Sequence, residues 1–347
     1  MYLVEKELRG QFDSIAKTVA YTLERSAGIR DFFADIDSIC VCGCGSSYSV
    51  AKSTAMQFAQ RTGKNAMALA AGDVLVNFSS YHKILERSAL ILLSRSGTTS
   101  ELRRMAELCR EQWPTIKIVA ICAAVDTPLG AMADLSLALP WAFDHAVCQT
   151  QTVSNLYLCG LTLSAIISND TGLLADIADI QQTAAAFTPN VEASIEALGQ
   201  TKFENVVVLA DSGMAGLAEE GSLAFKEICH SPSNFYNVLD VRHGPLITIG
   251  QNTLVIVLIS RGTHALQAEL VQDIAKQAGA ILVLNCTNTS VSVNGATELH
   301  LPETSHDDLS ALFMLYCIQL LCLKHALARG IDPDKPPGLD PWIKLNI

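Results

Sequence analysis

An apolar run that stops abruptly at a hydroxyl-rich turn is the feature that most constrains this chain. Residues 89–93 (ALILL) are all apolar, and residues 94–101 (SRSGTTSE) follow with five hydroxyl side chains. Residues 102–112 then have the spacing of an amphipathic helix. A helix that starts directly after a buried strand presents free N–H groups, which bind anions such as phosphate. Ser94, Ser96 and Thr99 add donors to such a site, although an ordinary helix cap also uses these residue types.

The same strand–turn–helix unit recurs along the chain, which predicts the fold class. A short buried strand near residues 39–42 leads through a Gly/Ser turn with Ser46 and Ser47 into a helix over 51–61. Further strands are expected near 66–70, 116–124 and 135–140, a loop over 72–80, and helices over 1–30, 149–169 and 307–329. Strands that alternate with helices favour a parallel α/β sheet covered on both faces, a three-layer αβα arrangement of the flavodoxin-like type.

The second half of the sequence repeats the pattern of the first. Val208 matches Val41 at an offset of 167 residues, and Ser260 matches Ser94 at an offset of 166. Two nearly equal offsets indicate an internal duplication, hence two tandem domains. The expected bounds are an N-terminal helix (1–30), a first domain (31–190), a second domain (200–330) and a C-terminal tail (331–347) over the active site. The second copy has lost most of the hydroxyls, so the first copy is expected to hold the anion.

Composition excludes several classes of function. A net charge of −11 argues against a nucleic-acid partner, which needs basic patches. Eleven cysteines in mostly apolar settings indicate small core residues in a reducing cytoplasm, and their spacing fits no metal site. The longest apolar segment (309–323) is shorter than a membrane span and is interrupted by Ser310 and Gln319, so no membrane association is expected.

Four motifs in order carry a family resemblance. GCGSSY and SRSGTTSEL occur in the first half, and EEGSLAFKE (219–227) and RHGPL (242–246) in the second. This set, over nearly the whole chain, resembles the sugar isomerase (SIS) family. Within the family it is similar to the isomerase half of glucosamine-6-phosphate synthase, to SIS-type glucosamine-6-phosphate deaminases and to fructosamine-6-phosphate deglycases.

The resemblance implies a phosphorylated sugar as the ligand, with no metal and no cofactor. Gln149 matches a loop that closes over the sugar. The residues that match the phosphate loops of the family are Ser46, Ser47, Ser94, Arg95, Ser96 and Thr99.

The resemblance also implies a catalytic set in the second domain. Glu227 matches the general base that moves a proton between C1 and C2 of a hexosamine or ketose 6-phosphate. Glu220 lies two helical turns before it on the same face. His243 matches a residue that assists ring opening, often from the neighbouring subunit, which implies a homodimer with the active site at the subunit interface.

Two departures from the synthase pattern bear on the reaction. Ala224 and Pro341 stand where the synthase carries lysines, and Lys344, three residues after Pro341, is the candidate to replace the second of them. The resemblance therefore implies an amino-sugar-phosphate isomerase or deaminase, and it leaves open a fructosamine-6-phosphate deglycase or a non-catalytic phosphosugar sensor.

Overall fold

The computed structural model describes all residues except 263, 341–344 and 346–347, and its contacts divide the chain into two compact units. The first domain consists of Arg9–Ala178 with the described residues of Leu339–Ile347. The second domain consists of Met1–Leu8 and Asp179–Gly338. The chain thus crosses between the units three times: within its first helix, near residue 179 and after Gly338.

The first domain is built on a parallel sheet of five strands in the order β2-β1-β3-β4-β5. All six residues of β3 are buried, as expected of a strand covered on both faces. The strands are β1 (Ser38–Gly43), β2 (Asn65–Ala70), β3 (Ala89–Ser94), β4 (Ile118–Cys122) and β5 (Leu135–Ala138).

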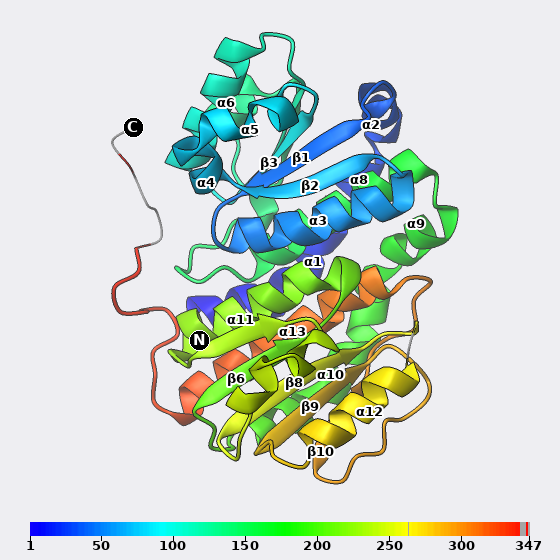
Figure 1. The fold of residues 1–347 in the computed structure, drawn as a ribbon, viewed down its shortest axis with the longest axis vertical. Coiled ribbons are helices and arrows are strands. Elements are labelled where there is room, and N and C mark those ends of the chain that lie inside the picture. The colour runs from blue at the N-terminus through cyan, green and yellow to red at the C-terminus, as the bar shows by residue number, and fades with distance from the viewer. Residues whose placement is uncertain (263, 341–344, 346–347) are drawn as a thin grey trace. The chain divides into compact units, whose positions relative to one another are not determined.

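Helices cover both faces of this sheet (Figure 1). Helices α4 to α7 contribute to an apolar core on one face, and α3 packs against α8 on the other. The helices that begin in this half of the chain are α1 (Leu3–Leu23), α2 (Ser26–Phe33), α3 (Ser46–Thr62), α4 (Ala71–Val76), α5 (Phe78–Leu85), α6 (Ser100–Gln112), α7 (Pro128–Met132), the short η1 (Pro140–Ala142), α8 (Gln151–Ser168) and α9 (Thr171–Ala178). The loop expected over 72–80 was wrong, because Val74 and Leu85 are fully buried in that core and hold two short helices there.

The second domain has the same topology. Its parallel sheet runs in the order β10-β9-β8-β6-β7, so both sheets have the flavodoxin-like order 2-1-3-4-5 when each is numbered from its own first strand. The predicted α/β class is confirmed. The strands are β6 (Asn205–Leu209), β7 (Ser233–Tyr236), β8 (Thr253–Ile259), β9 (Ala280–Asn285) and β10 (Ala296–His300).

Two long helices form most of one face of the second domain. Helix α13 (Asp307–Ala328) packs against α10 (Ile180–Gly199) and α11 (Ala215–Cys229), while α12 (His264–Ile274) lies on the other face. Short turns of 3₁₀-helix complete the domain: η2 (Ser212–Met214), η3 (Asp240–Arg242) and η4 (Pro245–Thr248). Among the described residues, α13 alone is long and apolar enough to cross a membrane, but 83% of its most apolar stretch is buried inside the structure, as predicted for a core helix.

Candidate functional site

The candidate anion site lies at the carboxyl edge of the first sheet, between β1 and β3. These strands are parallel neighbours, with Cys42 opposite Leu92, and the chain leaves β1 toward β2 on the far side. This reversal of strand order is the position at which α/β sheets bind ligands. The turns after β1 and β3 therefore open side by side at the edge where the sequence predicts a phosphate.

The turn after β1 is held close to its helix by glycine. A Cβ at Gly43 would lie 2.4 Å from the backbone carbonyl of Ser47, so no larger residue fits there without movement of α3. Gly45 has a φ of +53°, which favours glycine, and α3 begins at the next residue. Ser46 and Ser47 thus occupy the first turn of α3, both buried, where the free N–H groups and the helix dipole favour an anion.

The turn after β3 gathers the predicted hydroxyls. Ser94 Oγ accepts a hydrogen bond from Gly97 N at 3.0 Å and lies 3.0 Å from Thr99 Oγ1. Ser96 Oγ accepts from the backbone N of Thr98 at 3.2 Å and from its hydroxyl at 2.9 Å. Ser94 and Thr99 thus form one hydrogen-bonded pair and Ser96 and Thr98 another, all within residues 94–99, the predicted phosphate turn.

The guanidinium of Arg95 binds backbone carbonyls outside this turn. Its side chain is 7% exposed, and Nη1 donates to the carbonyl oxygens of Ala146 at 2.7 Å and Val147 at 3.3 Å. These carbonyls belong to the segment between η1 and α8 that carries Gln149. The role of Arg95 as a phosphate ligand stays a prediction.

Asp144 binds backbone groups of the segment that carries Gln149. Its carboxylate is fully buried and accepts the backbone N–H groups of Thr150 and Thr152, each at 2.8 Å. Burial raises the pKa of Asp144, while these hydrogen bonds and the positive charge of Arg95 act in the opposite direction. These contacts give Asp144 a structural role at the start of α8. Gln149 is half-buried, and among the described residues its Oε1 has no hydrogen-bond partner.

The C-terminal tail reaches the same region of the first domain. Leu345 N donates to Ser100 Oγ, the first residue of α6, at 3.2 Å. Lys344 and Pro341 lie outside the described residues, so the predicted contact of Lys344 with substrate stays a prediction.

The predicted acids of the second domain lie on α11. Glu220 is 1% exposed and Glu227 is half-buried, two turns later on the same helix. Burial lowers the pKa of Lys226, and the charges of Glu219, Glu220 and Glu227 oppose that effect, so these carboxylates lie within electrostatic range of the lysine.

His243 lies on an exposed loop of the second domain. It follows η3, and its backbone N donates to Asp240 O at 2.9 Å. Gly244, the next residue, has a φ of +129°, and Arg242 pairs with Asp273 of α12 at 2.7 Å. These contacts hold the loop against the domain, and the role of His243 in ring opening stays a prediction.

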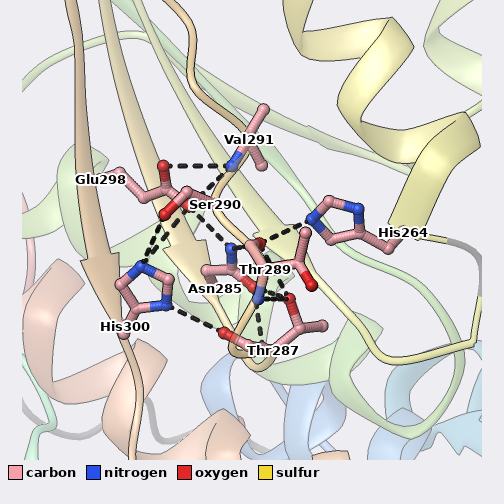
Figure 2. Close-up of polar contacts among 8 residues, drawn as sticks. All are labelled: His264, Asn285, Thr287, Thr289, Ser290, Val291, Glu298 and His300. Atoms are coloured by element: carbon pink, nitrogen blue, oxygen red, sulfur yellow. Dashed lines mark hydrogen bonds and ion pairs between the residues drawn. The ribbon is translucent and has the colours of Figure 1, made fainter.

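The second domain closes its own carboxyl edge with internal contacts. After β8, Ser260 exchanges two hydrogen bonds with Gln267, each at 2.8 Å, and the backbone N of Arg261 donates to the Asp307 carboxylate at 2.9 Å. After β9, Asn285 donates to Glu298 at 2.7 Å and to the carbonyl of Thr289 at 2.9 Å. Figure 2 shows how the side chains around Asn285, from His264 to His300, face one another in this network. These contacts support the prediction that the first domain, with its spare hydroxyls, is the one that holds the anion.

Comparison with known proteins identifies the fold. The SIS domain model matches twice, over residues 32–166 and 201–329, which together make up most of the chain. The chain belongs to the SIS domain family.

Some relatives of this SIS protein have the names of enzymes that act on sugar phosphates. A probable glutamine–fructose-6-phosphate aminotransferase (isomerizing) of Acanthamoeba polyphaga mimivirus is 26% identical over 329 residues, covering 88% of this chain and 51% of the relative. The chain thus spans about half the length of the curated relatives it matches.

Two solved structures share the fold at low sequence identity. Tagatose-6-phosphate ketose/aldose isomerase from Escherichia coli has a TM-score of 0.85 and 21% identity, covering 97% of this chain and 95% of that one. Glucosamine-6-phosphate deaminase from Thermotoga maritima has a TM-score of 0.74 and 22% identity, covering 95% of this chain and all of that one. Both structures show that this chain has the fold of those two proteins.

Two threonines contact residues of the turn after β3 in this SIS protein and were not among the predicted site residues. Thr98 donates to Ser96 through both its backbone N–H and its hydroxyl. In the sequence it is one of several hydroxyl residues in the turn, and nothing distinguishes it from the others. Thr127 packs so closely on Gly97 that a Cβ there would lie 2.4 Å from the threonine side chain. The glycine at 97 was a visible signal of close approach, but its partner, 30 residues later, had no signal in the sequence.

Proposed function

We propose that this SIS protein is an isomerase or deaminase of an amino-sugar or ketose 6-phosphate, with Glu227 moving a proton between C1 and C2. The observation that carries the proposal is the turn after β3, where Ser94, Ser96 and Thr99 place their hydroxyls within six residues at the switch point of the sheet. Backbone N–H groups and hydroxyls at a helix start suit a phosphate monoester in an acidic protein, because they need no basic patch.

The phosphate anchor serves the chemistry by positioning the sugar. Binding energy from the non-reacting phosphate orients C1 and C2 against the catalytic groups. A carboxylate such as Glu227 then removes a proton beside the carbonyl and returns it to the adjacent carbon. His243 suits ring opening because imidazole exchanges protons near neutral pH. Glu220, Gln149 and Lys344 complete the proposed site.

The names of the relatives support this class without deciding the reaction. They include isomerizing aminotransferases, a tagatose-6-phosphate isomerase and a glucosamine-6-phosphate deaminase. The proposal extends to a cytoplasmic homodimer whose active site takes His243 from the neighbouring subunit. The second candidate is a fructosamine-6-phosphate deglycase or a non-catalytic phosphosugar sensor. Ala224, which is buried and stands where the synthase carries a lysine, argues against the synthase's own reaction and leaves room for a deaminase as well as for these two functions.

A product screen distinguishes these functions. The purified protein is incubated with glucosamine 6-phosphate, fructose 6-phosphate and fructosamine 6-phosphates of several amino acids, and ammonia, free amino acid and ketose are measured. Ammonia identifies a deaminase, ketose–aldose interconversion alone an isomerase, and free amino acid a deglycase. Binding without turnover identifies a sensor, and the absence of both binding and turnover contradicts the proposal.

A further inference from the structure

Arg95 links two segments that the proposed function uses. Its backbone belongs to the phosphate turn, where the carbonyl oxygens of Ser94 and Arg95 both accept from Ala123 N, at 3.3 and 3.1 Å. Its buried guanidinium reaches out of the turn to the carbonyls of Ala146 and Val147. Arg95 therefore joins the turn to the segment that carries Gln149.

The Gln149 segment (residues 143–152) also contains hydrogen bonds between its own residues. Asp144 clamps the backbone of Thr150 and Thr152, and Gln151 Nε2 donates to Phe143 O at 3.1 Å. These contacts fix the shape of the segment, while Arg95 ties it to the phosphate turn. Burial raises the pKa of Asp144, and the positive charge of Arg95 opposes this effect.

The second domain repeats this arrangement without the hydroxyl cluster. Arg261 follows β8 as Arg95 follows β3. Its Nε donates to Cys286 O at 3.3 Å, and its Nη2 donates to Thr304 Oγ1 at 3.2 Å. Thr304 lies between β10 and α13, as Ala146 lies between β5 and α8. Arg261 therefore contacts the segment before α13 as Arg95 contacts the segment before α8. It does so although Asp307 closes the turn in the second domain.

We propose that Arg95 is a positioning residue, which holds the Gln149 segment against the phosphate turn and is not itself a phosphate ligand. This inference rests on the proposed binding of a sugar 6-phosphate. Its consequence is specific: Arg95 serves recognition of the sugar, through Gln149, while Ser94, Ser96 and Thr99 serve recognition of the phosphate.

The affinities for two ligands distinguish a positioning residue from a phosphate ligand. Calorimetric affinities for inorganic phosphate and for fructose 6-phosphate are measured with the wild type and with Arg95→Met, and hydrogen–deuterium exchange is followed over residues 143–152 without ligand. We expect inorganic phosphate to bind within about threefold of the wild type, while fructose 6-phosphate weakens by about tenfold or more, because a lost charged hydrogen bond frees the segment. Exchange in residues 143–152 rises by a similar factor.

Two further variants serve as controls. Arg95→Lys keeps one charged donor, so its effects should be intermediate, and it takes the place of Arg95→Met if that variant does not fold. Arg103→Met, on α6, removes a partly exposed arginine whose ion pair with Glu107 spans 3.8 Å, and it should change neither affinity nor exchange.

Two outcomes overturn the inference. The first is an equal loss of affinity for both ligands, which would make Arg95 a phosphate ligand. The second is no change in exchange in Arg95→Met. If the wild type binds neither ligand, the proposed function fails, but the exchange measurement still decides whether Arg95 holds the segment.

Discussion

Asp307 closes the turn after β8 by binding Arg261. One carboxylate oxygen accepts the backbone N–H of Arg261 at 2.9 Å, and the other lies 3.1 Å from its Nε. A carboxylate on a backbone N–H directly after a strand makes the contact that a phosphate oxygen is expected to make after β3. The second domain thus supplies an anion from its own chain.

The first prediction concerns this internal anion. Asp307→Asn should lower the free energy of unfolding by about 1–3 kcal/mol, because a charged hydrogen-bond acceptor is lost at a partly buried site. Chemical denaturation measures the change. Glu111→Gln is the control: its ion pair with Arg104 lies on the surface of α6, so a change within about 0.5 kcal/mol is expected. Equal effects of both variants would show that the Asp307 contact contributes no special stability.

The second prediction concerns the phosphate turn. Ser96→Ala combined with Thr99→Ala should weaken sugar-phosphate binding by about 10- to 100-fold, since each lost hydroxyl contributes about 0.5–1.5 kcal/mol. Calorimetric titration measures the affinity. Thr183→Ala, which removes an exposed hydroxyl from α10, should leave it unchanged. An unchanged affinity in the double variant would exclude this turn as the phosphate site.

The third prediction concerns catalysis across subunits. Glu227→Gln should abolish turnover while the sugar phosphate still binds, because the amide is not a base. His243→Ala should be nearly inactive as well. If His243 acts from the neighbouring subunit, remixing equal amounts of the two variants rebuilds one intact site per mixed dimer, and activity returns to about one quarter of the wild type. Mixtures that stay inactive after confirmed subunit exchange would place both residues in the same subunit's site.

The fourth prediction concerns the close approach of β1 and α3. Gly43→Ala should destabilise the first domain by about 1–3 kcal/mol, because the new methyl group meets the backbone of Ser47 and Tyr48, which cannot rotate away. Gly28→Ala is the matched control, since nothing lies within 4 Å of a Cβ there and alanine favours α2 by about 0.5–1 kcal/mol. Thermal unfolding should therefore shift in opposite directions, and a shift in the same direction would contradict the packing of the turn.

The fifth prediction concerns Cys44, the one partly exposed cysteine of the eleven. Burial, with the nearby charge of Glu101, raises the pKa of its thiol to about 11, against hydrogen bonds to Gly72 and Ala71 that lower it. Only the thiolate reacts with iodoacetamide, so at pH 8 labelling should be more than about 100-fold slower than for an ordinary cysteine of pKa about 8.5. The rate should rise about tenfold per pH unit up to pH 11. Fast labelling of native protein at pH 8, by mass spectrometry, would contradict this environment.

The sequence by itself determined the family, the α/β class and the location of the hydroxyl-rich turn after β3. These features are local: an apolar run, a hydroxyl-rich turn and a helical period lie next to one another within residues 89–112. Glu220 and Glu227 were assigned to one helical face for the same reason, because a spacing of seven residues is two turns wherever the helix lies.

Tertiary structure alone decided what the polar side chains contact. Arg95 reads as one more phosphate ligand, but its guanidinium binds a carbonyl 51 residues later in the chain. Arg261 and Asp307 are 46 residues apart, and no period or motif connects them. Residues 72–80 read as a loop, yet Val74 is buried in the core and the segment is largely helical. In each case the decisive partner is distant in sequence, and burial selects it only when the sheets and helices have packed.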